Sequence, residues 1–117
     1  MYTCECPPPP ERLFSPNGEL SDKGRAWVGG VAYLMRRDIA REPGKPYVKV
    51  AIYESPKRIT PSYIANTLAG VLHALVAAKL IDGVAPQNLS GAQILPMRKA
   101  AKEKPAVQVG VGYRRDG

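Results

Sequence analysis

Twenty consecutive residues without a charged side chain, Ile59–Ala78, limit what this chain can fold into. A stretch of this length is long enough to cross a lipid bilayer. It contains Pro61, Asn66 and His73, however, and it is rich in alanine, whereas membrane spans are usually more uniformly apolar. We therefore expect a largely buried helix of a globular domain and not a transmembrane segment.

The same stretch carries the signals of a helix from Pro61 to about Leu80. Thr60 is a suitable N-cap, and proline is favoured at the first helical position. Asp82-Gly83 is expected to close the helix. The main apolar stripe comprises Ile64, Leu68, Val71, Leu72 and Leu75, and the opposite face comprises Ser62, Asn66, Ala69, His73 and Ala77. Because solvent-facing helix surfaces normally carry charges, we expect this small, neutral face to be covered by a partner or by loops of the chain.

An earlier helix is predicted to begin near Ser21 and to end at Pro43-Gly44. Ser21 is a good N-cap, and apolar residues follow it at helical spacing. Gly29-Gly30 weakens this helix by about 1 kcal/mol per glycine. We interpret the pair as a place where another element packs closely.

Alternation of apolar and polar residues predicts the strands. It is clearest in Tyr47–Glu54, where Val48, Val50 and Ile52 share one face. Tyr2–Cys6 is expected to be a short first strand, stopped by the prolines Pro7–Pro10.

The last third of the chain is interpreted as a hairpin of the strands Ala92–Met97 and Ala106–Tyr113, with Pro96 placing the former at an edge or a bulge. The resulting order is strand, helix, strand, helix, strand, strand. We expect residues 1–117 to form a single α+β domain in which two main helices pack on a mixed sheet.

The charge of the chain favours polyanionic partners. Its net charge is +7 and its pI is about 9.7, and such a balance raises the local concentration of nucleic acid. An alternative is that the charge serves solubility alone. The candidate DNA-binding residues are Lys57, Arg58, Arg98, Lys99, Lys102, Lys104, Arg114 and Arg115. Tyr53, Tyr63 and Tyr113 are candidates for stacking on unpaired bases.

Cys4 and Cys6, the only cysteines, are expected to be strand thiols in a reducing compartment. The first residues lack the pattern of a secretory signal, so a cytoplasmic location is expected. No cluster of Cys and His completes a zinc site, and we expect no metal or other cofactor. A lone histidine on a helix more often packs against neighbours or faces solvent than takes part in function, and we expect the same of His73, the only histidine.

The order and spacing of these elements resemble the RusA-type Holliday junction resolvases, small dimeric Mg²⁺-dependent endonucleases often encoded by phages and prophages. The resemblance covers nearly the whole chain. Its landmarks are Pro7–Pro10 after the first strand, Ser21–Trp27 at the start of the first helix, Lys49–Tyr53 in the central strand, Tyr63–Leu68, and Leu80–Gly83. The resemblance implies a RusA-like fold, DNA binding, a homodimer and a phage or prophage origin.

The acids that hold the metal in that family are mostly missing here. Its Asp-x-Asp-Asn motif falls on Tyr63, Ala65 and Asn66, and its later pair of aspartates falls on Asp82 and Gly83. Mg²⁺ is a hard cation that takes oxygen ligands and favours carboxylates. Asn66 and Asp82 alone are therefore not expected to hold it, and cleavage is expected to be lost.

Three functions remain open at this stage. The first is a catalytically impaired resolvase-like protein that binds DNA, including branched DNA. The second is a repurposed fold that binds and modulates a host protein. The third is an active nuclease in which Asp82 acts with acids brought from elsewhere, such as Glu54, or from a partner subunit, and only this alternative would require Mg²⁺. Fold alone does not decide among them.

Overall fold

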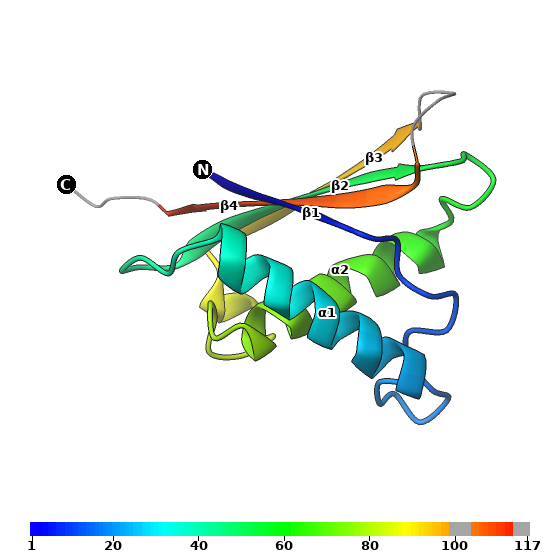
Figure 1. Cartoon of the computed structure of the whole chain (residues 1–117), viewed down its shortest axis with the longest axis horizontal. Coiled ribbons are helices and arrows are strands. Elements are labelled where there is room, and N and C mark those ends of the chain that lie inside the picture. Colours follow the sequence, from blue (N-terminus) through cyan, green and yellow to red (C-terminus); the bar gives the residue numbers. More distant parts are fainter. Residues whose placement is uncertain (99–103, 114–117) are drawn as a thin grey trace.

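The helices of this protein cover one face of a four-stranded sheet and leave the other face open (Figure 1). The computed structural model describes residues 1–98 and 104–113, and for Arg98 the backbone alone. The elements are β1 (Tyr2–Cys6), α1 (Asp22–Asp38), β2 (Pro46–Glu54), α2 (Pro61–Ala77), a 3-10 turn (Pro86–Asn88), β3 (Gly91–Arg98) and β4 (Ala106–Tyr113). The expected single α+β domain, with the order β-α-β-α-β-β, is confirmed.

The strand order in the sheet is β1-β4-β2-β3. β4 is antiparallel to both of its neighbours, with Val109 opposite Cys4 on one side and Val50 on the other. β2 and β3 are parallel and are joined through α2, as parallel strands require a crossover connection.

The prediction of a terminal hairpin is wrong, because β2 lies between β3 and β4. The expected edge position of the strand that contains Pro96 is confirmed, since β3 is the last strand of the sheet. Proline has no backbone N–H for a second ladder, which suits an edge.

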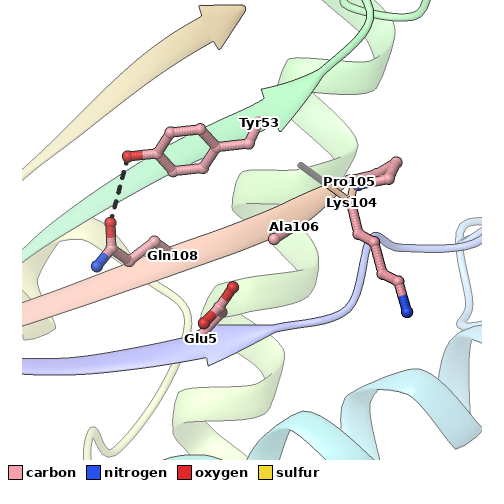
Figure 2. A pocket seen from close by; sticks show the side chains of 6 residues that line it. All are labelled: Glu5, Tyr53, Lys104, Pro105, Ala106 and Gln108. Atoms are coloured by element: carbon pink, nitrogen blue, oxygen red, sulfur yellow. Dashed lines mark hydrogen bonds between the residues drawn. The ribbon is translucent and has the colours of Figure 1, made fainter. Parts of the chain in front are cut away.

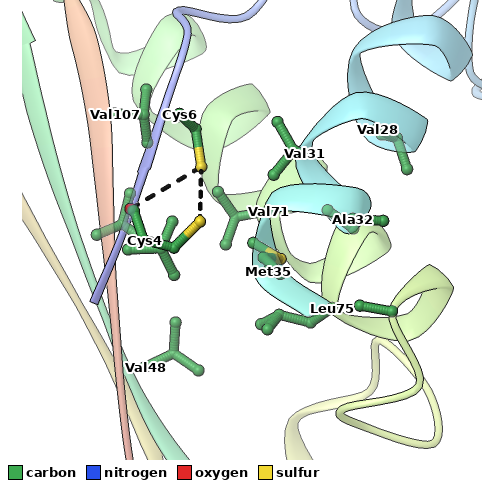
Figure 3. Close-up of a cluster of buried hydrophobic side chains, with 14 of the residues drawn as sticks. Cys4, Cys6, Val28, Val31, Ala32, Met35, Val48, Val71, Leu75 and Val107 are labelled. Carbon is green, nitrogen blue, oxygen red and sulfur yellow. Dashed lines mark hydrogen bonds between the residues drawn. The ribbon is translucent and has the colours of Figure 1, made fainter. Parts of the chain in front are cut away.

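The core lies between the sheet and the two helices (Figure 3). The inward residues of β2 are those expected from its alternation, Val48, Val50 and Ile52, and all are fully buried. They are joined by Val107, Val109 and Val111 of β4, by Val28, Val31 and Met35 of α1, and by Val71 and Leu75 of α2. Burial of this apolar surface is the main stabilising contribution to such a fold.

Cys4 and Cys6 contribute thiols to the same core. Their Sγ atoms are 3.7 Å apart, and both side chains are buried. They are free cysteines, as predicted. Burial raises the pKa of both thiols above its usual value, so they remain neutral and behave as small apolar groups.

α1 begins where its cap predicts and ends earlier than expected. The Ser21 hydroxyl accepts a hydrogen bond from the Gly24 amide at 2.9 Å. The helix ends at Asp38, where the Ile39 amide donates to the Met35 carbonyl, so Pro43-Gly44 lies outside it.

Close packing occurs at glycines other than those predicted. Gly29 and Gly30 are exposed, and a β-carbon on either would meet no atom within 4 Å. A β-carbon on Gly24 would instead collide with the Leu13 carbonyl, and one on Gly70 would lie 2.5 Å from Leu13 Cδ2. The Gly29-Gly30 interpretation is therefore wrong, and the segment before α1 is what needs glycine.

α2 ends three residues before the predicted Leu80. Lys79 takes the left-handed conformation, with φ of 60°. Its amide donates to the Val76 carbonyl, and the Leu80 amide donates to the Leu75 carbonyl, each at 2.9 Å. This pair of bonds is a Schellman motif, so Lys79 closes the helix in place of Asp82-Gly83.

Within residues 1–98 and 104–113, no helix is both long and apolar enough to cross a membrane.

Candidate nucleic-acid interface

One end of the molecule gathers the last residues of β2, the loop that follows it, the start of α2 and the proline segment Pro7–Pro10 (Figure 1). In the loop, the Arg58 amide donates to the Ser55 carbonyl at 3.0 Å, which forms a turn. This turn leaves Lys57 and Arg58 exposed. The Thr60 hydroxyl then accepts from the Tyr63 amide at 3.1 Å and caps α2, as predicted.

The proline segment is held in place by the helix it precedes. The Trp27 indole Nε1 donates to the Pro7 carbonyl at 3.0 Å, and Leu13 is buried against Gly70 and Trp27. Pro8, Pro9 and Pro10 are left half-buried beside the start of α2. These contacts fix a rigid wall next to the helix N-terminus.

A cavity of about 290 Å³ lies between the proline wall and α2. Among its lining residues, Glu54 and Thr67 are buried, whereas Arg58 and Asn66 are exposed. The other lining residues are Pro8, Pro9, Pro10, Glu11, Thr60, Ser62 and Tyr63. The cavity therefore has a buried polar floor and an exposed rim that carries one charge of each sign, Arg58 and Glu11.

Glu54 is the last residue of β2 and points inward, in phase with Val50 and Ile52. Its side chain is 4% exposed, and its Oε1 accepts the Ser55 amide at 2.9 Å. From the sequence, Glu54 was expected only as a substitute acid in an active nuclease. The strand alternation was the signal that places it on the helix side of the sheet.

Tyr63 also lines this cavity, with its hydroxyl buried and without a hydrogen-bond partner among the described residues. Burial raises the pKa of this phenol, the nearby Glu54 carboxylate raises it further, and Arg58 opposes the rise. A buried hydroxyl without a partner is costly. Because its hydroxyl is buried, Tyr63 is poorly placed for the base stacking that its sequence position suggested.

The two other candidate stacking tyrosines have different surroundings. Tyr53 lies on the open face of the sheet, where its hydroxyl donates to Gln108 at 3.4 Å (Figure 2). The Tyr113 hydroxyl is buried without a partner in the described residues. Of these two tyrosines, Tyr53 is the one whose hydroxyl lies on the open side of the sheet.

A hollow of about 380 Å³ surrounds Tyr53 and Gln108 on that open side. Glu5 and Lys104 also line it, and the Lys104 side chain points away from Tyr53 (Figure 2).

Four of the eight basic candidates lie within the part of the chain that the structure describes. Lys57 and Arg58 are exposed in the turn after β2, Arg98 pairs with Glu54 in the sheet register, and Lys104 is exposed just before β4. The structure brings these four positions to one end of the sheet. Lys99, Lys102, Arg114 and Arg115 lie outside the described residues.

The two remnants of the metal-binding motif are not brought together. Asn66 lines the cavity at the start of α2. Asp82 follows the far end of that helix, where its carboxylate accepts from Arg41 at 3.1 Å. The helix from Asn66 to Ala77 alone spans about 16 Å, so one ion cannot bind both residues.

The donor set near Asn66 does not fit Mg²⁺. It offers two carboxylates, the buried Glu54, one of whose oxygens already accepts an amide, and the exposed Glu11, together with the neutral amide of Asn66. Mg²⁺ demands near-octahedral oxygen ligands and gives up water reluctantly. In the described part of the chain, no three Asp, Glu, His or Cys side chains come together to hold a metal.

The second face of α2 is partly covered by the chain itself. The Phe14 ring packs against His73, with ring centroids 5.7 Å apart, which agrees with the packing role expected for this histidine. Ala69 is half-buried, whereas Ser62, Asn66 and Ala77 remain exposed. The expectation of a covered face holds for its middle and fails at its ends.

Neither the scan against models of known protein families nor the search among curated proteins finds a match for this chain.

Proposed function

We propose that this protein is a catalytically impaired, RusA-like nucleic-acid-binding protein that binds DNA, including branched DNA, with the end of the sheet that carries Lys57 and Arg58. The observation that carries the proposal is the convergence of four basic positions at one end of the sheet. Lys57 and Arg58 lie beside α2, while Arg98 and Lys104 lie at the adjoining ends of β3 and β4. A cytoplasmic location and a phage or prophage origin belong to the same proposal.

Clustered cations act on the phosphate backbone. Each phosphate that a lysine or arginine neutralises releases counterions, so the logarithm of the affinity falls with the logarithm of the salt concentration, by about 0.9 per contact. Such contacts position the nucleic acid and supply affinity without sequence information. The rim residue Arg58 would contribute in this way to binding at the mouth of the cavity.

The proposal includes no cleavage. Metal-assisted hydrolysis of a phosphodiester requires an ion held by several oxygens. Here Asn66 and Glu54 lie in the cavity, and Asp82 pairs with Arg41 beyond the other end of α2. These residues support a binding protein better than a nuclease.

The test is a salt titration of DNA binding by fluorescence anisotropy, with four-way junction and linear duplex of the same sequence. Neutralising the pair in Lys57→Gln/Arg58→Gln should flatten the salt slope by about two units. The matched control is Arg36→Gln/Lys45→Gln, which neutralises two exposed cations, one in the last turn of α1 and one directly before β2. Equal slopes for the two double variants, or no affinity for DNA at low salt, would contradict the proposal.

A homodimer would use the open face of the sheet. Within residues 1–98 and 104–113, no helix covers this face (Figure 1), and Met1, Leu95 and Met97 are 71%, 38% and 41% exposed on it. An exposed apolar patch of this kind marks an interaction surface. Light scattering after size exclusion should show a dimer that Leu95→Lys converts to a monomer.

The same face favours the second candidate function, the binding of a host protein by a repurposed fold. In that case the protein would be a monomer with the apolar face accessible. Capture of a protein from host lysate that survives nuclease treatment and is lost in Leu95→Lys, together with no affinity for DNA, would favour it. Capture that disappears with nuclease would favour DNA binding.

A further inference from the structure

Glu54 is a nearly buried carboxylate that faces a cavity and has no described side-chain donor. It is 4% exposed, and its one described hydrogen bond comes from the Ser55 backbone amide. Burying a carboxylate is costly unless donors satisfy its oxygens. The remaining acceptor capacity of Glu54 is therefore available to a ligand that enters the cavity.

The cavity walls restrict the shape of that ligand. Pro8, Pro9 and Pro10 form one side, and α2 with Tyr63 forms another. Proline rings and a tyrosine edge are apolar surfaces that suit a planar ring. The volume of about 290 Å³ lies just below the usual range for small-ligand pockets, about 300–1,000 Å³.

The rim selects a different chemical group from the floor. Arg58 and the acid Glu11 are both exposed there. The Ser62 amide belongs to the first turn of α2, where backbone N–H groups lack helical partners. A cation beside a helix N-terminus favours phosphate. The site therefore suits a ligand that offers hydrogen-bond donors to its floor and an anionic group beside Arg58 at its rim.

Guanine is the base whose pairing edge presents two adjacent donors, N1–H and N2–H. A carboxylate can accept both in a charge-assisted pair. Adenine and cytosine place an acceptor next to their amino group, and thymine places its single N–H between two carbonyls. Either arrangement would set a lone pair against Glu54.

We infer that the cavity between Pro8–Pro10 and α2 binds a guanine nucleotide, with Glu54 accepting from the base and Arg58 with the α2 N-terminus facing the phosphate. The inference rests on the proposed function where the nucleotide is an unpaired residue of a DNA strand. Reading an unpaired base on its pairing edge is the usual way in which proteins recognise splayed strands.

The experiment compares forked duplexes that carry a short unpaired flap of guanine, hypoxanthine or adenine. Hypoxanthine lacks only the N2 amino group, so wild-type protein should bind the guanine flap about 5- to 150-fold more tightly than the hypoxanthine flap. Equal affinity for the two flaps would overturn the inference, and this comparison needs no variant that folds.

Glu54→Gln should remove the preference while leaving the salt slope unchanged, because Gln keeps one acceptor and replaces the other with a donor. Glu19→Gln, at an exposed site away from the cavity, should keep the preference. A preference that survives in a folded Glu54→Gln protein would assign it to another site and overturn the inference.

Free nucleotide distinguishes the source of the ligand and separates this inference from the proposed function. Calorimetry with dGMP and with its hypoxanthine counterpart tests the cavity without any DNA strand. Binding of dGMP as tight as that of the flap would identify the free nucleotide as the ligand, and much weaker dGMP binding would identify the strand. If no DNA binds at low salt while dGMP binds selectively, the proposed function fails and the cavity assignment stands.

Discussion

Leu13 packs directly on Gly70, so that its Cδ2 lies 2.5 Å from the place a β-carbon on that glycine would take. Trp27 closes the same space at 3.0 Å. Through this contact the segment that carries the proline wall is fastened to α2. The cavity beside Glu54 therefore depends on glycine in the middle of a helix.

Glycine substitutions should have opposite effects at buried and exposed positions. Gly70→Ala should lower the free energy of unfolding by about 1–3 kcal/mol, because the methyl group overpacks the core. Gly29→Ala and Gly30→Ala meet open space and should each raise it by about 1 kcal/mol through helix propensity. Urea unfolding followed by circular dichroism measures all three, and a stabilised Gly70→Ala variant would show that Leu13 moves aside freely.

The helix end at Lys79 offers a second test. Lys79 holds φ of 60°, a conformation that costs a non-glycine residue about 1–2 kcal/mol. Glycine removes this conformational cost from the folded state, but it also raises the entropy of the unfolded chain, which offsets part of the gain. Lys79→Gly should therefore stabilise the protein by about 0.5 kcal/mol. Lys79→Val, with a branched side chain at positive φ, should destabilise it. Thermal melts of the two variants in opposite directions would agree with this account, and equal melting temperatures would contradict it.

The buried hydroxyl of Tyr63 predicts a gain in stability on its removal. Because this hydroxyl has no described partner, Tyr63→Phe should stabilise the protein at neutral pH by about 1 kcal/mol. Tyr53→Phe, which removes an exposed hydroxyl bonded to Gln108, is the control and should change stability by less than about 0.5 kcal/mol. A destabilised Tyr63→Phe protein would reveal a partner for the hydroxyl.

The same tyrosine predicts a loss of stability at alkaline pH. Burial, with the Glu54 carboxylate, raises the pKa of Tyr63 in the folded protein above its usual 10.0. The unfolded chain then loses its proton first, so this contribution to stability is fully present below pH 10 and is lost as the pH rises through the higher folded value. Chemical unfolding at a series of pH values should show a smaller alkaline loss in Tyr63→Phe than in wild type.

The separation of Asn66 from Asp82 predicts that neither supports metal-dependent cutting. Purified protein should leave four-way junctions intact with Mg²⁺ or Mn²⁺, since the described residues offer no adequate set of ligands. Asp82→Asn should change stability by less than about 1 kcal/mol, because its pair with Arg41 is largely exposed. Metal-dependent cutting that disappears in Asp82→Asn would instead support an active nuclease.

The local elements of this fold could be read from the sequence. The inward face of β2, the caps Ser21 and Thr60, and the edge position of the strand with Pro96 follow from alternation, hydroxyl chemistry and the missing proline amide. Each of these depends on residues only a few positions apart, where stereochemistry alone decides.

What failed was the pairing of distant segments. Short spacing between β3 and β4 favoured a hairpin, yet β2 takes the place between them. The strand–helix–strand unit of β2, α2 and β3 requires parallel neighbours once the helix covers the sheet, and this tertiary requirement outweighs sequence proximity. The wall of the cavity was missed for the same reason, because no local pattern shows that Trp27 holds the Pro7 carbonyl.

The position of β4 between β1 and β2 also governs when this protein can become folded during its synthesis. A nascent chain that lacks Ala106–Tyr113 has β1 with no strand to pair with, and one edge of β2 stands open. The side chains of Val107, Val109 and Val111 are then missing from the middle of the core. These residues must therefore emerge from the ribosome before the native sheet can assemble. Every earlier intermediate exposes unpaired strand edges, which promote aggregation.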